Sequence, residues 1–228
     1  MPATRKQTAV RDLLLVGLTY ASGAVDAICF LGLGKIFTAF QTGNLVFIGI
    51  DAADAGGPDV VRVACSLLGF AAGVFAGAGL VRASKGSGLW PGRVTAALCL
   101  GLAAQTAFFV LWALTSGQPG TASGDVLAAM SALAMGLQSA AIMSLAVTGV
   151  FTTAATATVI FVMRDLEDRT GTQVVERARL AGVLVALCAG AAAGGALLVH
   201  ARVYAPLLPL AATALVIATA SIAFRARS

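Results

Sequence analysis

Residues 37–51 read FTAFQTGNLVFIGID, a polar interruption inside an otherwise apolar chain. Gln41, Thr42, Gly43 and Asn44 follow one another where aliphatic side chains would be expected. Glycine adopts backbone conformations that are closed to other residues, so the run is typical of a broken helix. Non-helical backbone at membrane depth persists only when it is buried in protein or lines a wet cavity. The run therefore predicts a polar lining, with a simple kink or cap as the alternative.

The composition around this run indicates an integral membrane protein. The chain has 228 residues, of which 59% are hydrophobic and 11% are charged, and its mean hydropathy is +0.93. Soluble domains usually carry about 25% charged residues, so this chain has too few polar side chains to cover a globule in water. The net charge of +5 comes from short basic loops, which suits an anionic inner leaflet and does not suggest nucleic acid. We expect a single membrane domain over residues 1–228.

Eight apolar segments divide the chain. Two of them, 36–50 and 151–163, are short and rich in threonine, and short runs of this kind are typical of re-entrant or broken helices. The other six are about 20 residues or longer, which is enough to span a bilayer as helices. The predicted spans are 13–34, 60–81, 94–116, 126–147, 180–199 and 204–224. The fold class is therefore all-α, a polytopic membrane helical bundle. The first span imitates a signal peptide, but its apolar run is long for one; cleavage is the alternative.

The order of the segments indicates an internal repeat. The halves, about 12–116 and 125–225, each contain a long helix, a short threonine-rich piece and two further long helices. TGN at 42–44 matches TAT at 156–158 with an offset of 114 residues. The sequence therefore predicts two halves built to the same plan.

The third segment of each half carries small residues at a spacing of four. This spacing lets two helix backbones approach closely, which is how helices associate in lipid. We expect tight packing inside the bundle, and a specific dimer seam is a second interpretation. The predicted packing residues are Gly69, Gly73, Gly77, Gly190 and Gly194.

The distribution of Lys and Arg predicts the orientation. With a cytoplasmic N-terminus and six spans, 12 of the 15 basic residues lie inside, whereas eight spans leave 10 inside. The positive-inside rule therefore favours six spans, with both termini in the cytoplasm. Six spans also make the two halves inverted, which is the build of many channels and secondary transporters.

Asp26 is the only acidic residue deep in a predicted span. It lies nine residues before Lys35, or about 13 Å along a helix that rises 1.5 Å per residue. A carboxylate near the bilayer centre costs at least about 2.5–3.5 kcal/mol. We therefore expect Asp26 to face a cavity, pair or take up a proton, with a structural cap or interhelical hydrogen bond as the alternative. Its counterpart in the second half falls at Gln138–Ala140.

The predicted binding residues combine this acid with the two polar interruptions. Threonine often bonds its own helix, so a structural role is the alternative for each Thr. In the charged stretch 163–180 we expect a cytoplasmic loop with a short amphipathic helix, and the alternative is a gating contact by Arg164 or Asp165. The substrate- or ion-binding candidates are Asp26, Gln41, Thr42, Gly43, Asn44, Gln138, Ser139, Thr153, Thr156 and Thr158.

Several of these residues together form a pattern that resembles the bacterial YoaK family of membrane proteins of unknown function. The pattern runs from Gly23-x-x-Asp26 through Phe37, Phe40 and Thr42-Gly43-Asn44. It continues in GLQSA at 136–140 and VFTTAATAT at 150–158 and covers nearly the whole chain. That family commonly has Gly where this chain has Ala157 and Asn where it has Ser139, so strict symmetry of the two breaks is not expected. The resemblance implies a bacterial inner-membrane protein and supplies no substrate.

The function expected from the residues is that of a small-solute transporter or channel with a polar site near mid-membrane, proton-coupled if it is active. The alternative is a non-transporting scaffold or assembly protein that associates through GxxxG helix faces. Enzyme motifs such as GxSxG, HExxH and the P-loop are not found, so we expect neither an enzyme nor a cofactor. The four cysteines lie in apolar runs and the chain has one histidine, so no metal site is expected. The expected partners are the lipid bilayer and a small solute, with a homo-oligomer left open.

Overall fold

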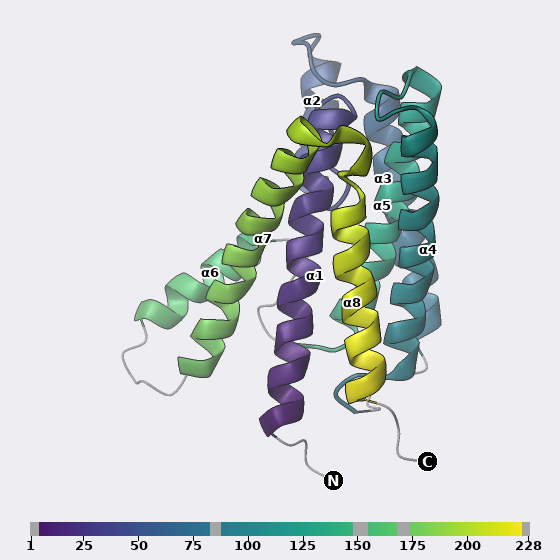
Figure 1. The fold of residues 1–228 in the computed structure, drawn as a ribbon. Helices are drawn as coiled ribbons and strands as arrows, with labels where there is room; N and C mark the ends of the chain where they lie inside the picture. Colours follow the sequence, from purple (N-terminus) through teal and green to yellow (C-terminus); the bar gives the residue numbers. More distant parts are fainter. Residues whose placement is uncertain (1–4, 83–87, 148–154, 168–173, 225–228) are drawn as a thin grey trace.

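The computed structural model describes residues 5–82, 88–147, 155–167 and 174–224, without the side chains of 155, 157, 164–167 and 174–177 (Figure 1). Over these ranges the chain is all-α and contains no strand. The helices are α1 (Arg5–Gly32), α2 (Gln41–Ala52), α3 (Val60–Val81), α4 (Gly92–Leu114), α5 (Thr121–Met143), α6 (Ala155–Glu167), α7 (Val174–His200), the 3-10 turn η2 (Arg202–Tyr204) and α8 (Leu207–Ala223).

Six helical segments of the described chain are long and apolar enough to cross a membrane. They are α1, α3, α4, α5, the Ala178–His200 part of α7, and η2 with α8 over Arg202–Ala223. The expected all-α fold is confirmed, and these six segments have the length and apolar composition of the expected spans. By contrast, α2 has 12 residues and α6 has 13, fewer than the roughly 20 that a spanning helix needs.

The long helices stand side by side, with both ends of the chain at the same end of the bundle (Figure 1). The short helix α2 lies at the opposite end and packs on α3, whereas α6 packs on α7 and extends sideways from the bundle. The most extensive helix contacts join α3 to α5 and α1 to α7. Both are contacts between helices that run in the same direction (Figure 1).

Glycines bring the backbones of these parallel pairs into direct contact. A Cβ atom placed on Gly73 would overlap the Leu133 carbonyl of α5, and one on Gly190 would overlap the Tyr20 carbonyl of α1. Any side chain at these positions would separate the helices, which is why small residues recur at a spacing of four. The other predicted packing glycines have the same surroundings: Gly69 faces Ala129, Gly77 faces Leu137 and Ala140, and Gly194 faces Ala24.

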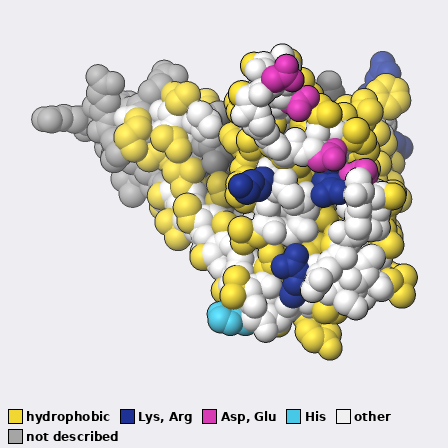
Figure 2. Space-filling view, turned by 90° about the horizontal axis from the view of Figure 1, so that it is seen from above, with side chains coloured by type: hydrophobic (Ala, Val, Ile, Leu, Met, Phe, Trp, Pro, Cys, Tyr) yellow, Lys and Arg dark blue, Asp and Glu magenta, His cyan; other side chains and the backbone are white. Residues whose placement is uncertain are grey.

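Larger apolar side chains fill the core of the bundle and also cover its outer surface. One buried cluster includes Leu15, Leu18 and Leu98, and a second includes Ile28 and Trp112. Large apolar side chains also point outward along the spans, as a lipid-facing surface requires. Viewed onto the end that carries α2, charged side chains gather among hydrophobic ones (Figure 2).

Replacing Gly73 by valine should destabilise the protein, because the added carbons meet the α5 backbone. Overpacking of this kind typically costs about 1–3 kcal/mol, and we expect a lower thermal unfolding temperature in lipid nanodiscs. Gly79 is the matched control, since it lies on the same helix and a Cβ there would meet nothing within 4 Å. Equal unfolding temperatures for Gly73→Val and Gly79→Val would show that the α3–α5 contact does not need glycine.

Candidate functional site

The segment between α1 and α2 folds back along α1. Gly34 turns the chain with a φ of +83°, and the Lys35 N–H donates to the Phe30 carbonyl at 2.8 Å. Asp26 lies six residues before the end of α1, about 9 Å below it at 1.5 Å per residue. Residues 38–40 nevertheless contact Asp26, so the chain descends beside the helix that it has just left.

The Asp26 carboxylate holds three consecutive backbone amides of this segment. Its Oδ1 accepts the N–H groups of Thr38 at 2.9 Å and Ala39 at 2.8 Å, and its Oδ2 accepts the N–H of Phe40 at 3.0 Å. These amides immediately precede Gln41, where α2 begins. The carboxylate therefore holds the segment that leads into α2, and it makes no hydrogen bond to the N–H groups of the first turn of that helix.

The Asn44 side chain bonds both backbone groups of Phe37. Its Oδ1 accepts the Phe37 N–H at 3.0 Å, and its Nδ2 donates to the Phe37 carbonyl at 2.7 Å. Gln41 Nε2 donates to the Thr38 carbonyl at 2.8 Å, and the carbonyls of Ala39 and Phe40 accept backbone N–H groups of α2. Every backbone N–H and C=O from Phe37 to Phe40 is thus hydrogen-bonded inside the protein, as unwound backbone at membrane depth must be.

Two serines tie the same segment to the neighbouring helices. Ser66 of α3 donates to the Phe37 carbonyl at 2.7 Å and accepts from Asn44 Nδ2 at 3.2 Å. Ser131 of α5 shares a 2.9 Å hydrogen bond with the Thr38 hydroxyl. Sequence reasoning missed both serines, because a lone hydroxyl in an apolar run usually bonds its own helix. The available signal was that both polar side chains lie within predicted spans.

Gly43 does not break the helix, contrary to expectation. It lies inside the first turn of α2, and the break comes earlier, between Gly32 and Gln41. A Cβ on Gly43 would lie 2.9 Å from the Phe37 ring and 3.0 Å from the Phe40 ring. Glycine at this position therefore makes room for two aromatic rings, and its backbone freedom is not what the fold uses.

A cavity of about 520 Å³ lies beside Asp26. Its walls come from α1, residues 37–40, the first turn of α6 and the middle of α7. Ser22, Asp26 and Thr156 are the polar residues among its described lining, and the rest are apolar. Phe37 supplies part of the wall, stacking on Phe30 with ring centroids 5.0 Å apart and meeting Phe40 edge-on at 5.3 Å.

The remaining predicted site residues lie apart from the cavity or outside the described part of the chain. Thr42 is exposed on α2, and Thr158 is buried in α6. Gln138 donates to Ser22 at 2.9 Å, whereas Ser139 donates to a carbonyl of its own helix at 2.8 Å. Thr153 and the side chains of Arg164 and Asp165 fall outside the described residues. The structure thus gathers Asp26, Gln41, Gly43 and Asn44 around one segment and brings Thr156 to the same cavity.

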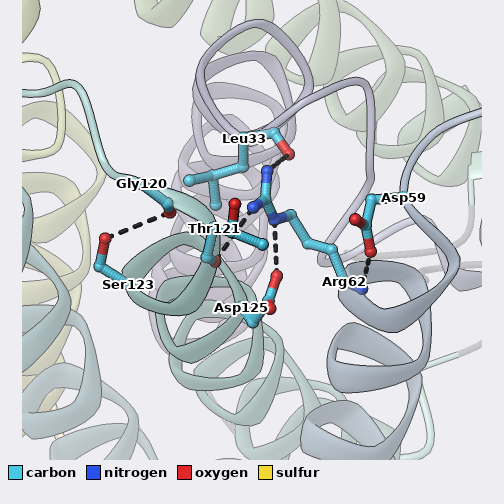
Figure 3. A network of polar contacts seen from close by, with 7 residues as sticks. All are labelled: Leu33, Asp59, Arg62, Gly120, Thr121, Ser123 and Asp125. Carbon is cyan, nitrogen blue, oxygen red and sulfur yellow. Dashed lines mark hydrogen bonds and ion pairs between the residues drawn. The ribbon is translucent and has the colours of Figure 1, made fainter.

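Arg62 forms a separate polar network at the end of the bundle near α2 (Figure 3). Its guanidinium donates to Asp125 at 2.9 Å and to the carbonyls of Leu33 and Thr121 at 3.1 Å each. One side chain therefore joins the end of α1 to the starts of α3 and α5. A Cβ on Gly124 would lie 2.7 Å from the guanidinium, so glycine makes room for this contact. Arg62 was not among the functional residues predicted from the sequence.

The chain is similar to known proteins over most of its length. The family described as "Protein of unknown function (DUF1275)" matches residues 14–220. The chain belongs to this DUF1275 family. It is also similar to the UPF0700 transmembrane protein YoaK of Bacillus subtilis (strain 168), with 30% identity over 161 residues, or 71% of this chain and 69% of that protein. The resemblance seen in the sequence is confirmed. No solved structure matches this DUF1275 chain.

Truncating Asn44 to alanine should release the unwound segment. The variant leaves the Phe37 N–H buried without its acceptor, which typically costs about 1–3 kcal/mol. We expect faster hydrogen–deuterium exchange at the amides of residues 37–40 and a lower unfolding temperature. Thr42→Ala, two residues away on the exposed side of α2, should leave both unchanged. Unaltered exchange in Asn44→Ala would show that the segment is held by other contacts.

Proposed function

We propose that this DUF1275 protein is a small-solute membrane transporter whose substrate site is the cavity beside Asp26. The observation that carries the proposal is a carboxylate on the wall of a cavity of about 520 Å³, where unwound backbone and the start of a second short helix meet. Small-molecule sites usually occupy about 300–1,000 Å³. Ionisable residues within membrane spans commonly mark substrate, ion or proton pathways.

Paired glycine contacts support an inverted repeat. Gly23 of α1 lies against the Leu187 carbonyl of α7, and Gly136 of α5 lies against the Phe70 carbonyl of α3. Gly136 follows Gly23 by 113 residues (136 − 23), and Leu187 follows Phe70 by 117 (187 − 70). Exchanging the two halves therefore converts one contact into the other. The short helices also correspond, since α2 packs on α3 in the first half and α6 packs on α7 in the second.

Two ion pairs at opposite ends of the bundle show the same correspondence between the first and second halves of the chain. Arg62 of α3 pairs with Asp125 of α5 at 2.9 Å, and Arg179 of α7 pairs with Asp12 of α1 at 3.7 Å. The offsets are again 113 for the acids (125 − 12) and 117 for the bases (179 − 62). Inverted repeats with interrupted helices and a site between the halves are the build of many secondary transporters.

The contacts of residues 37–40 suggest how movement is coupled to the site. Asp26 holds the segment to α1, which packs on α7 and α8, whereas Ser66 and Ser131 hold it to α3 and α5. In the proposed mechanism these two groups of helices rock against each other, and the segment is their junction. Proton uptake by Asp26 would remove the charge that binds three amides and loosen the junction on one side. Among the described side chains, Cys29 is a titratable neighbour of Asp26, and it contacts Thr38 and Ser131.

The proposed orientation places both termini in the cytoplasm of a bacterium and the α2 end outside the inner membrane. The two termini share one end of the bundle (Figure 1), in keeping with an even number of crossings. A reporter inserted after Gly88, between α3 and α4, should therefore be cytoplasmic, because that connection lies at the end of the termini. A periplasmic reporter at this site would mean that α2 crosses the membrane and that the positive-inside argument fails.

A scaffold that associates through its GxxxG faces is the second function predicted by the sequence. Gly69, Gly73 and Gly77 are buried against α5. Gly190 and Gly194 lie against α1. Since these glycines already contact neighbours within the chain, the transporter is the function that we favour.

The proposal predicts that the cavity is reached by water from both sides of the membrane. In a background without the native cysteines, Ala27→Cys and Thr156→Cys should each react with a membrane-impermeant maleimide in right-side-out and in inverted vesicles, because alternating access opens the site to each side. Phe75→Cys is the control: Phe75 is 84% exposed on the apolar outside of α3, so its thiol should face lipid. Cavity cysteines no more reactive than Phe75→Cys in either orientation would refute the transporter.

A further inference from the structure

We infer that the cavity beside Asp26 takes a lipophilic organic cation, such as an amine or quaternary onium ion with apolar substituents. The inference rests on the proposed function of this cavity as the substrate site and assigns the chemical class of the substrate. It stands on three properties of the described cavity wall, namely its charge, its aromatic rings and its few polar groups.

The charge of the wall is negative. Among the described residues that line the cavity, Asp26 alone is charged, and its side chain is only partly buried. Its Oδ1 already accepts two amide N–H groups, but its Oδ2 accepts only that of Phe40. A carboxylate oxygen has two acceptor positions, so Oδ2 keeps capacity for a donor or a cation in the cavity. An anionic substrate would meet this carboxylate without a compensating positive side chain on the described wall.

Aromatic rings stand next to the carboxylate. Phe30, Phe37 and Phe40 all line the cavity, with Phe37 stacked on Phe30 at 5.0 Å and edge-on to Phe40 at 5.3 Å. The Phe40 backbone N–H bonds Asp26, so the residue that carries one of these rings is tied to the carboxylate. Ring faces attract cations through their quadrupole, and quaternary ammonium groups are recognised in this way. The combination of one carboxylate and several rings is suited to a cation that is too bulky to be strongly hydrated.

The rest of the described wall offers a strongly polar substrate few partners, since Ser22 and Thr156 are its polar residues besides Asp26. Ala27, Leu31, Leu187 and Ala191 are apolar, and the Ser22 hydroxyl already bonds Leu18 and Gln138. A sugar or a small inorganic ion would lose its water here and gain few hydrogen bonds in return. An organic cation loses less, because its substituents are themselves apolar. The volume of about 520 Å³ accommodates such a molecule.

Tetraphenylphosphonium and tetraphenylborate test the inference, because they have nearly the same shape and opposite charge. Binding is measured by equilibrium dialysis on the full chain in nanodiscs, with empty nanodiscs as the blank. We expect saturable phosphonium binding and at least roughly tenfold weaker borate binding, since the lone carboxylate attracts one and repels the other. Equal or stronger binding of borate would overturn the inference without the need for any variant.

Two substitutions locate the bound cation. Asp26→Asn should weaken phosphonium binding by roughly tenfold or more by removing the charge. Ala191→Leu should weaken it by filling the cavity while leaving the carboxylate and its three amide bonds in place. Phe75→Leu, on the lipid-facing surface, is the control and should bind as the native chain does. Phosphonium binding that neither cavity variant changes would place the cation elsewhere and overturn the inference.

The outcome can be separated from that of the transporter proposal. If Ala27→Cys reacts from both sides and phosphonium shows no saturable binding, the cation assignment is wrong and the transporter stands. If Ala27→Cys is inert and phosphonium does not bind, both are wrong. Saturable, charge-selective binding that depends on Asp26 and Ala191 supports the assignment.

Discussion

One carboxylate and three backbone amides determine the architecture around the cavity. Asp26 lies within the first span, where a charge is costly unless it is compensated, and residues 38–40 carry amides that no helix uses. Each group would be unfavourable in lipid alone, and together they satisfy one another. This interaction holds the chain beside α1 after Gly34 has turned it, and it positions the residues that precede α2. The aromatic wall of the cavity follows from the same turn, because Phe37 and Phe40 are carried by the descending segment.

Backbone contact between parallel helices supplies the rigid frame for this segment. Where lipid removes the hydrophobic drive for association, close packing and interhelical hydrogen bonds must hold helices together. The glycines at the α1–α7 and α3–α5 contacts provide the first, and Ser66 and Ser131 provide the second. The cavity lies where unwound backbone from one half meets the start of α6 from the other. The wall of the cavity thus contains residues from both halves of the chain.

The parts of the structure that follow from local physics could be read from the sequence. Apolar runs of about 20 residues have one stable form in a bilayer, so the six long helices were predictable, as was the close packing of small residues spaced by four. What depends on tertiary neighbours was not. Gly43 was expected to bend the chain, but its role is set by the Phe37 and Phe40 rings that pack over it. Asn44 was expected either to bond freed backbone groups or to line a pore, and the structure shows the first role, although the sequence could not show that its partner would be Phe37. The residues next to Ser66 and Ser131 in the sequence do not indicate that these serines would bond the Phe37 carbonyl and the Thr38 hydroxyl of the unwound segment.

The proximity in sequence of Asp26 and its amide partners bears on how the chain enters the membrane during synthesis. The three donors follow the carboxylate by 12, 13 and 14 residues. They emerge from the ribosome directly after α1, long before α7 can dock. The nascent first hairpin thus carries the means to shield its own acid, so insertion of the first span does not have to wait for the C-terminal half. The glycine contact between α1 and α7 can form only after α7 has been made, which makes closure of this side of the bundle a late step of biogenesis.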